Sequence, residues 1–266
     1  MSDINPLLNR RPTSNPYRYA ASLIWNRLKW DLDPESWRSR KRLKACKDKY
    51  AGDKAVIVCN GPSLLKSDFS LLEGVFTFGL NKIYLLFDKS NFRSSCIVAQ
   101  DQFTIEQSAD FYNQTDIPLY IVNSGARIIK KSDNVTFIHY CPQFKFSQDC
   151  SVSIYTGYTV TFLAMQLAFH MGFTNVALIG CDHNYFATKR PSRKTVASVE
   201  KDYNYFDPNY QSSEVKGNLP DLLQSEISYN LARDMYKAHG RSIVNATEGG
   251  NLEIFPRIQL LEFINT

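Results

Sequence analysis

The sequence lacks the features of membrane-spanning and secreted proteins. No apolar run approaches the roughly 20 residues that a membrane-spanning helix needs, and residues 1–16 contain no apolar core of a secretory signal peptide. The six cysteines show neither a CxxC spacing nor the Cys/His pairing of zinc sites, and several fall inside apolar runs. We therefore expect a cytoplasmic protein with reduced thiols in its core and no metal site built from Cys and His.

Common nucleotide-binding and catalytic motifs are also missing. The sequence contains no P-loop GxxxxGK[ST], no GxGxxG, no GxSxG and no HExxH. These absences disfavour phosphoryl transfer of the Walker type and redox chemistry with a dinucleotide cofactor. Any nucleotide site must therefore be built from other residues.

What the sequence does have is an uneven charge distribution. The formal net charge is +5, and the basic residues concentrate near the start of the chain. Residues 17–30 combine a helical apolar spacing with interleaved arginine and lysine, and residues 37–49 are densely basic. We predict that residues 1–53 form a basic, amphipathic helical arm.

Two interpretations of this arm remain open from the sequence. In the first, a solvated charged helix packs its aromatic residues on the main domain. In the second, the arm lies on anionic lipid headgroups, and the protein is peripheral at the inner face of the membrane. Nucleic acid is not an expected partner, because the sequence has no recognisable nucleic-acid-binding motif.

Strands and helices alternate over the rest of the chain. We expect strands at residues 55–59, 75–81, 95–99, 118–123, 135–139, 175–180 and 242–245, and long helices at residues 157–171 and 226–239. Gly172 and Gly240 follow the two helices as end signals. This alternation predicts an α/β domain over residues 54–266, Rossmann-like, with a mostly parallel sheet and helices on both faces.

The first strand leads into a tight turn, Asn60-Gly61-Pro62-Ser63. Gly61 would let a ligand approach the backbone, and Pro62 fixes φ without leaving an N–H unpaired. A turn at the carboxyl end of a strand in an open α/β sheet is a common ligand site. An ordinary strand-to-loop turn is the alternative.

Polar residues end several of the expected strands. They are Asn60, Asn81, Asp101, Asn123, Asp182 and Asn245. In a parallel sheet these ends meet at one edge, so the set predicts a pocket for a polar ligand. Turn preference for Asn and Asp explains any single member equally well.

A long polar stretch without periodicity covers residues 186–220. Segments of this length inside a compact domain are commonly active-site lids or surface loops. We therefore place a lid at about residues 186–220, in which Tyr203 and Tyr205 could donate hydrogen bonds to a leaving group. A surface loop without a role in the site is the alternative.

Two acidic residues and one histidine at strand ends could take part in ligand binding or catalysis. Asp101 and Asp182 could hold Mg²⁺ together with substrate phosphates, or accept hydrogen bonds from a ribose or an amide. His183 follows Asp182 and could act as a general acid or base near neutral pH.

Several pieces of the sequence resemble two known families. CNGPSLLKSDFSLL and FGLN resemble the start of the bacterial sialyltransferases of glycosyltransferase family 42. AQDQ, TGYTVTFLAMQLAFHMGF, VALIGCDHNY and VNATEGG resemble the 6-hydroxymethylpterin diphosphokinase MptE-like family more closely. The resemblance covers roughly residues 54–250 and leaves the lid unmatched. The second family includes archaeal pterin kinases and bacterial proteins of surface-glycan and flagellin-glycosylation systems.

The resemblance implies a glycosyltransferase GT-A-like variant of the fold and a set of site residues. In the sialyltransferases, the Asn and Gly of this turn and the later Asn hold a CMP-sugar donor. By that likeness the nucleotide-binding residues are Asn60, Gly61, Pro62, Ser63, Asn81, Asp101, Gln102, Gly157 and Thr247. The catalytic candidates are Asp182, His183, Tyr203 and Tyr205. The lid histidine that serves as base in the sialyltransferases is absent, since residues 184–238 contain no histidine.

Three functions remain open on these grounds. The leading hypothesis is a glycosyltransferase of bacterial surface-glycan biosynthesis, such as lipopolysaccharide biosynthesis. It would take a nucleotide-activated, CMP-linked sugar donor and a glycan or lipid-linked acceptor, and would require no cofactor. The alternative is a diphosphokinase that transfers pyrophosphate from ATP to a pterin-like alcohol with Mg²⁺ on Asp101 and Asp182. The third is a nucleotide-binding module without catalysis.

Overall fold

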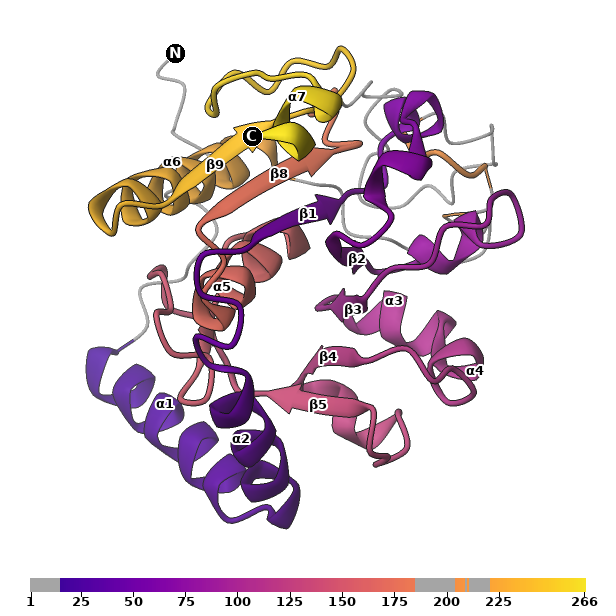
Figure 1. The fold of residues 1–266 in the computed structure, drawn as a ribbon. Helices are drawn as coiled ribbons and strands as arrows, with labels where there is room; N and C mark the ends of the chain where they lie inside the picture. The colour runs from indigo at the N-terminus through magenta and orange to yellow at the C-terminus, as the bar shows by residue number, and fades with distance from the viewer. Residues whose placement is uncertain (1–14, 185–203, 209, 211–220) are drawn as a thin grey trace, which may run out of the picture.

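The computed structural model describes residues 15–184, 204–208, 210 and 221–266 (Figure 1). Within these residues, seven strands form one sheet in the order β5-β4-β3-β2-β1-β8-β9, and every pairing in it is parallel. The strands are β1 (Lys54–Val58), β2 (Phe76–Leu80), β3 (Cys96–Ala99), β4 (Leu119–Val122), β5 (Val135–Ile138), β8 (Asn175–Ile179) and β9 (Ser242–Asn245).

Strand β1 lies inside the sheet and pairs on both sides. Val58 is in register with Gly79 of β2 and with Ile179 of β8. Ala55, Val56 and Ile57 are completely buried. Burial on both faces explains why this strand reads as a continuous apolar run and not as an alternation of apolar and polar residues.

The strand order reverses at β1. The chain adds β2 to β5 on one side of β1 and then returns to place β8 and β9 on the other side. The two loops that leave β1 and β8 therefore diverge, which opens a crevice at the carboxyl ends of these strands.

Helix α5 (Val160–Met171) connects the two halves of the sheet. Eleven of its twelve residues are buried, so it is apolar on all sides and not only on one stripe. It starts at the cap residue Thr159 and ends at Gly172, whose φ of 98° is left-handed. The two-stranded sheet of β6 (Tyr140–Cys141) and β7 (Ile154–Tyr155) precedes it. Helix α6 (Leu222–Ala238) packs on α5, where the Tyr236 hydroxyl donates to the Met165 carbonyl at 2.8 Å.

Shorter elements complete the layers on the two faces of the sheet (Figure 1). They are α3 (Gln102–Gln107), α4 (Ala109–Tyr112), α7 (Leu260–Asn265) and the 3-10 turns η1 (Pro62–Lys66), η2 (Phe69–Leu72), η3 (Ile83–Leu86) and η4 (Asn123–Arg127). Of these, α7 contacts β8 and η2.

Helices α1 (Pro16–Asp31) and α2 (Pro34–Cys46) precede the sheet, and α2 is fixed to it. The Ser39 hydroxyl of α2 accepts a hydrogen bond from the Phe137 N–H of β5 at 2.9 Å. The carbonyl of Leu43 lies 2.9 Å from the Nε2 atom of His170 in α5. Helix α1 is mostly exposed, with Trp30 as its one buried residue.

The sequence-based fold class is confirmed as Rossmann-like α/β with a parallel sheet. Each expected strand and both expected long helices are present, with boundaries that differ by a few residues. The division of the chain at residue 53 stays a prediction. Among the described helices, none combines the length and the apolar character that crossing a bilayer would require.

Candidate functional site at the carboxyl edge of the sheet

A pocket of about 960 Å³ lies at the carboxyl edge of the sheet, where the strand order reverses. Residues that follow β1, β2, β3 and β8 line it, together with the segment before α5 and the first part of α6. The candidate residues that line it are Asn60, Gly61, Asn81, Asp101, Gln102, Asp182, His183 and Tyr205. The tertiary fold thus brings these eight residues together, while their role in binding or catalysis stays a prediction.

The turn after β1 is held by Asp182, which follows β8. One carboxylate oxygen of Asp182 accepts from the Ser63 hydroxyl at 2.7 Å, and the carboxylate also accepts from the Ser63 N–H at 3.2 Å. A Cβ atom on Gly61 would lie 2.0 Å from the same carboxylate. Only glycine therefore fits at position 61, and Asp182 serves here to shape the turn.

Four buried oxygen atoms on the pocket walls have no hydrogen-bond partner in the described structure. They belong to Asn60, Asn81, Gln100 and Asn184. The orientation of the Asn60 amide is fixed, because its nitrogen donates to the Leu80 carbonyl at 2.9 Å and to the Tyr210 hydroxyl at 3.1 Å. Since unpaired buried acceptors are costly, these oxygens suit a ligand with several hydrogen-bond donors.

Lys82 brings a buried positive charge to the pocket. It is 6% exposed and is the one Lys or Arg among the buried residues of the described structure. Its ammonium group donates to the Gln107 side chain and, at 2.6 Å, to the Tyr210 carbonyl. Burial lowers the pKa of Lys82, against the opposing effect of Asp101. An ammonium has three donors, so one remains for an anionic ligand.

His183 is paired with a carboxylate. Its Nε2 atom lies 2.9 Å from Oε1 of Glu226 in α6. This contact places Nε2 as the donor and leaves Nδ1 as an acceptor, which is the arrangement of a general base oriented by an acid. The sequence singled out His183 but not its partner.

Unusual backbone conformations concentrate at this pocket. Four of the non-glycine residues in the described ranges have a positive φ, and three of them, Asn81, Tyr158 and His183, line it. Such conformations cost free energy and persist where the surrounding fold imposes them, which is commonly at functional sites.

Of the segment predicted as a lid, the structure describes residues 204–208 and 210. The ring of Tyr205 stacks on that of Tyr210 with centroids 4.0 Å apart. The Phe206 N–H donates to the Asn60 carbonyl at 3.0 Å, so this part of the segment lies against the turn after β1. Tyr203 and most of residues 186–220 fall outside the described residues.

The pair of carboxylates proposed for Mg²⁺ is already engaged. Asp182 binds Ser63, and one oxygen of Asp101 caps α3 by accepting from the Thr104 N–H at 2.9 Å. The described residues contain no group of three or more His, Cys, Asp or Glu side chains suited to a metal ion. These residues therefore do not fit a prebuilt cation site. The next candidate in the sequence, Gln102, is engaged as well, because its side-chain amide donates to the Glu106 carboxylate at 2.9 Å.

Four candidate residues support the pocket from outside its lining: Pro62, Ser63, Gly157 and Thr247. The Thr247 hydroxyl accepts from the Cys181 N–H at 3.1 Å and so braces the loop after β8. A Cβ atom on Gly157 would lie 2.1 Å from the Phe162 ring, so close packing requires glycine there. In the described structure, these four residues contact neighbouring parts of the chain and do not line the pocket.

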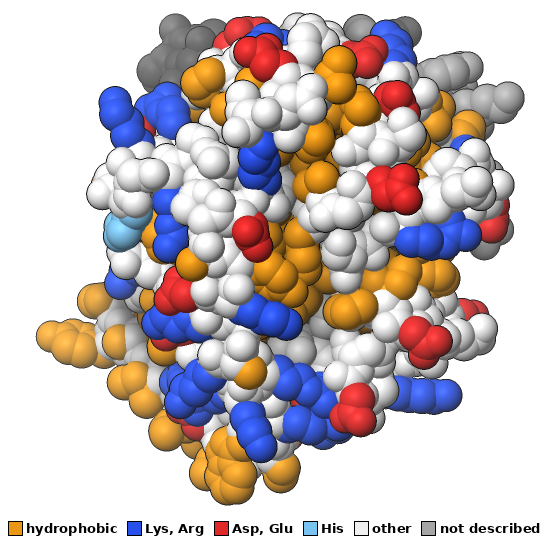
Figure 2. Space-filling view, viewed as in Figure 1, with side chains coloured by type: hydrophobic (Ala, Val, Ile, Leu, Met, Phe, Trp, Pro, Cys, Tyr) orange, Lys and Arg blue, Asp and Glu red, His pale blue; other side chains and the backbone are white. Residues whose placement is uncertain are grey.

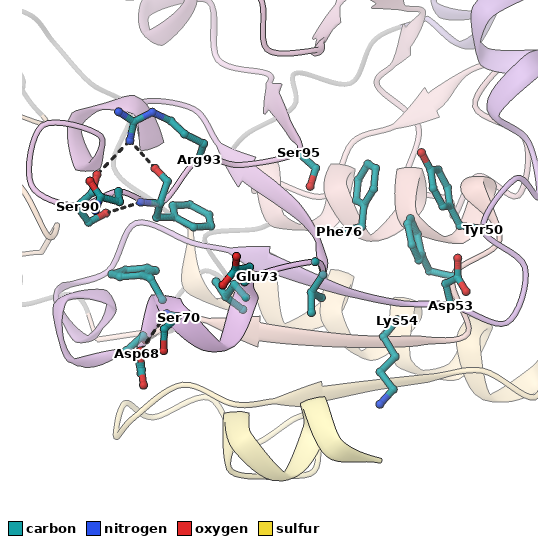
Figure 3. A pocket seen from close by; sticks show the side chains of 18 residues that line it. Tyr50, Asp53, Lys54, Asp68, Ser70, Glu73, Phe76, Ser90, Arg93 and Ser95 are labelled. Carbon is teal, nitrogen blue, oxygen red and sulfur yellow. Dashed lines mark hydrogen bonds between the residues drawn. The ribbon is translucent and has the colours of Figure 1, made fainter.

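A larger hollow of about 1190 Å³ lies at the opposite, amino-terminal edge of the sheet (Figure 3). Its labelled residues include Lys54 and Phe76, which begin β1 and β2. Polar groups of this hollow form hydrogen bonds with one another. The Asp68 carboxylate accepts from the Ser70 N–H, and the Arg93 guanidinium donates to the Ser90 carbonyl. We favour the smaller pocket, because ligands of open α/β sheets bind at the carboxyl ends of the strands.

Sequence reasoning missed several residues of the favoured pocket: Lys82, Gln100, Tyr158, Asn184, Tyr210 and the His183 partner Glu226. Lys82 and Gln100 adjoin the predicted strand-end residues Asn81 and Asp101, so extending each strand end by one residue could have found them. No local pattern marks Glu226, which lies 43 residues after His183.

Fold and pocket together define an α/β protein of the Rossmann-like type with a polar pocket at the switch point of its sheet. Residues 35–188 match the model of the family described as 6-hydroxymethylpterin diphosphokinase MptE-like. The match covers more than half of the chain, and the protein belongs to this family. The resemblance to the MptE-like family seen in the sequence is thereby confirmed.

Comparison with other proteins adds one likeness. The structure of the MAf glycosyltransferase from Magnetospirillum magneticum AMB-1 is similar at a TM-score of 0.49 and 13% sequence identity. The likeness covers 86% of this chain and 39% of that one, so this chain spans less than half the length of that protein. No curated protein matches the chain.

Proposed function

We propose that the protein is a transferase that binds a nucleotide-activated sugar, most simply a CMP-linked one, in the pocket at the carboxyl edge of the sheet. The observation that carries the proposal is the set of buried, unpaired oxygens of Asn60, Asn81, Gln100 and Asn184 around one buried cation, Lys82. Hydroxyl groups of a ribose and a sugar, and the amino group of a base, are the donors that such acceptors require.

Charge balance favours a donor with few phosphate charges. Among the described residues, Lys82 is the one buried cation that lines the pocket, and Asp101 and Asp182 add negative charge beside it. A sugar linked to a nucleoside monophosphate carries far less negative charge than ATP, whose phosphates are normally held by Mg²⁺ and several donors. The spare N–H of Lys82 would bind the phosphate of the donor.

The reaction follows from the placement of His183. Its Nδ1 atom would take the proton of an acceptor hydroxyl, while Glu226 stabilises the resulting imidazolium. The acceptor oxygen would then bond to the anomeric carbon as the bond from that carbon to the phosphate oxygen breaks. The leaving nucleoside monophosphate keeps the electron pair, and Lys82 stabilises its charge.

A diphosphokinase is the second candidate, and the family description is the observation that favours it. That function would move pyrophosphate from ATP to a pterin-like alcohol with Mg²⁺. The engaged carboxylates of Asp101 and Asp182 weigh against it.

Calorimetry separates the candidates. We expect CMP to bind without Mg²⁺, and the more highly charged CTP and ATP to bind more weakly with or without it. Binding of ATP that depends on Mg²⁺, with no binding of CMP, would instead establish the kinase. Binding of CMP with no hydrolysis or transfer of any CMP-sugar would indicate a binding module without catalysis.

A further inference from the structure

The outer face of α1 exposes a stripe of apolar side chains. Tyr17, Ile24, Trp25, Leu28 and Leu32 are each between 48% and 83% exposed. Their spacing from Tyr17, at seven, eight, eleven and fifteen residues, puts them on one side of the helix. Scattered single apolar residues are normal on a surface, but a continuous stripe on one helix indicates a binding face.

The packing of α1 fixes the direction of this stripe. Trp30 is 5% exposed and packs into the core from the opposite side of the helix. On that inner side Arg27 also donates to the Val152 carbonyl and to the Ser153 hydroxyl. The stripe therefore points away from the part of the chain that the structure describes, and none of those residues covers it.

Positive charge surrounds the stripe. Residues 15–49 contain ten Lys and Arg against four Asp and Glu, a net charge of +6, whereas the whole chain has a net charge of +5. Figure 2 shows hydrophobic side chains with Lys and Arg next to them along the lower edge, where Figure 1 places α1 and α2.

The acidic residues of this region are paired within the protein. Asp31 binds Arg27 and Arg40, and Glu35 binds Arg38. In contrast, exposed basic residues without an acidic partner among the described residues are Arg18, Lys29, Lys41, Lys44 and Lys49. The charge available to an external partner is therefore positive.

On both α1 and α2, basic residues lie next to an exposed tryptophan, which is the arrangement that binds a membrane surface. Arg18 and Lys29 are three helical turns apart and border the stripe of α1. On α2, Trp37 is 67% exposed and shares its face with Lys41 and Lys44, four and seven residues later. Tryptophan prefers the headgroup region of a bilayer, and lysine and arginine bind its anionic lipids.

We propose that α1 and the outer face of α2 dock the protein on an anionic lipid bilayer. The apolar stripe enters the headgroup region, and the surrounding basic residues bind lipid phosphates. A second copy of the chain fits this surface less well, because two faces of the same positive charge repel each other. This docking does not depend on which reaction the pocket performs.

Vesicle binding of the full chain, without any nucleotide, tests the proposal. We expect the protein to sediment with phosphatidylcholine vesicles that contain phosphatidylglycerol, and to bind pure phosphatidylcholine vesicles at least about tenfold more weakly. The double variant Trp25→Glu/Leu28→Glu should lose at least about tenfold in binding to the anionic vesicles. Lys41→Gln/Lys44→Gln should lose about 25-fold, at about fivefold for each basic residue.

Matched controls sit elsewhere on the surface. Leu261→Glu alters a residue of α7 that is 56% exposed, and Lys66→Gln/Lys237→Gln removes two exposed charges outside the helical region. Both controls should bind vesicles as the parent protein does. Equal loss in the controls and the test variants would overturn the proposal, as would absence of binding to anionic vesicles. Light scattering that shows a dimer dissociated by Trp25→Glu/Leu28→Glu, without vesicle binding, would assign the face to self-association.

Discussion

The carboxylate of Asp182 accepts hydrogen bonds from both the hydroxyl and the backbone N–H of Ser63, 119 residues earlier in the chain. These bonds join the turn after β1 to the loop after β8 at the point where the strand order reverses. Gly250 packs against the backbone of Asp182 from the other side, where a Cβ atom would meet the Asp182 carbonyl at 2.6 Å. The Asp182 side chain therefore helps to fix the shape of the pocket, together with the backbone bond from the Gly61 N–H to the Gly180 carbonyl at 2.8 Å.

Asp182→Ala should destabilise the protein by about 2–3 kcal/mol, because it leaves the Ser63 N–H buried and unpaired. Ser63→Ala removes one hydrogen bond to a charged acceptor and should cost about 1–2 kcal/mol. Urea unfolding followed by circular dichroism measures both values. The double variant should cost less than the sum of the two single variants, because the residues form one interaction.

The control for this prediction is Asp116→Ala, which removes an exposed carboxylate. Its free energy of unfolding should stay within about 0.5 kcal/mol of the parent value. Additive effects of the Asp182 and Ser63 variants would show that the two residues do not act as a pair.

Lys82→Met should weaken nucleotide binding about ten- to a hundredfold if the ammonium group binds a phosphate, since bonds between charged groups contribute about 1.5–3 kcal/mol. Methionine keeps the length of the buried side chain. Calorimetry with CMP measures the change, and cytidine without phosphate should lose little affinity. The exposed Lys66→Met is the matched control. An equal loss for CMP and cytidine would mean that Lys82 only supports the fold of the site.

His183→Gln should lower turnover of the donor sugar by a factor of about 10²–10⁴ while leaving the affinity for the nucleotide nearly unchanged, as expected for removal of a general base. Glu226→Gln should cause a smaller loss, because it weakens the orientation of the imidazole but keeps a hydrogen bond. Steady-state kinetics across pH measures both.

His239→Gln is the control, since His239 is exposed at the end of α6 and lies outside the pocket. Normal turnover in His183→Gln would exclude the imidazole as base. An equal loss of nucleotide affinity and turnover would instead assign His183 to binding.

His139 should make the stability of the protein depend on pH. Burial, supported by the positive charge of Arg27 and opposed by Asp31, lowers the pKa of His139 from 6.5 to about 4. Between these two values the unfolded chain binds more protons than the folded one. The free energy of unfolding should therefore fall as the pH drops from 6.5 toward 4, and the contribution of neutral His139 should be fully present above pH 6.5.

Urea unfolding at several pH values in this range measures the slope. His139→Gln keeps a side chain able to bind Ser153, whose hydroxyl lies 2.8 Å from Nδ1 of His139, and should flatten the slope. A smaller slope should remain from His170, whose pKa burial also lowers. An unchanged slope in His139→Gln would contradict the prediction.

The polar residues at the strand ends show how much of the pocket the sequence pattern could predict. Asn60, Asn81, Asp101 and Asp182 meet in the pocket, at the carboxyl ends of β1, β2, β3 and β8. The other two, Asn123 and Asn245, follow β4 and end β9, and they do not line the pocket. Their side chains accept hydrogen bonds from the backbone instead, from the Tyr140 N–H and the Thr247 N–H. Distance from the reversal does not explain this division, because β9 lies as close to β1 as β3 does; the partners that each side chain finds in the packed chain do.

The sequence by itself determined the elements and their chemical character. Apolar runs bounded by Gly, Pro and Asn define the buried strands, and the spacing of apolar residues defines α1, α5 and α6. These signals depend on neighbours within a few residues, so they can be read along the chain.

Only the tertiary structure decided which side chains share a space and which have partners. The bond of Asp182 to Ser63, the contact of His183 with Glu226 and the burial of Lys82 each join residues that are distant in sequence. The outward direction of the apolar stripe on α1 likewise follows from where Trp30 packs. The physical reason is that burial and hydrogen bonding are properties of the packed chain, and a local pattern gives the residue type but not its neighbours.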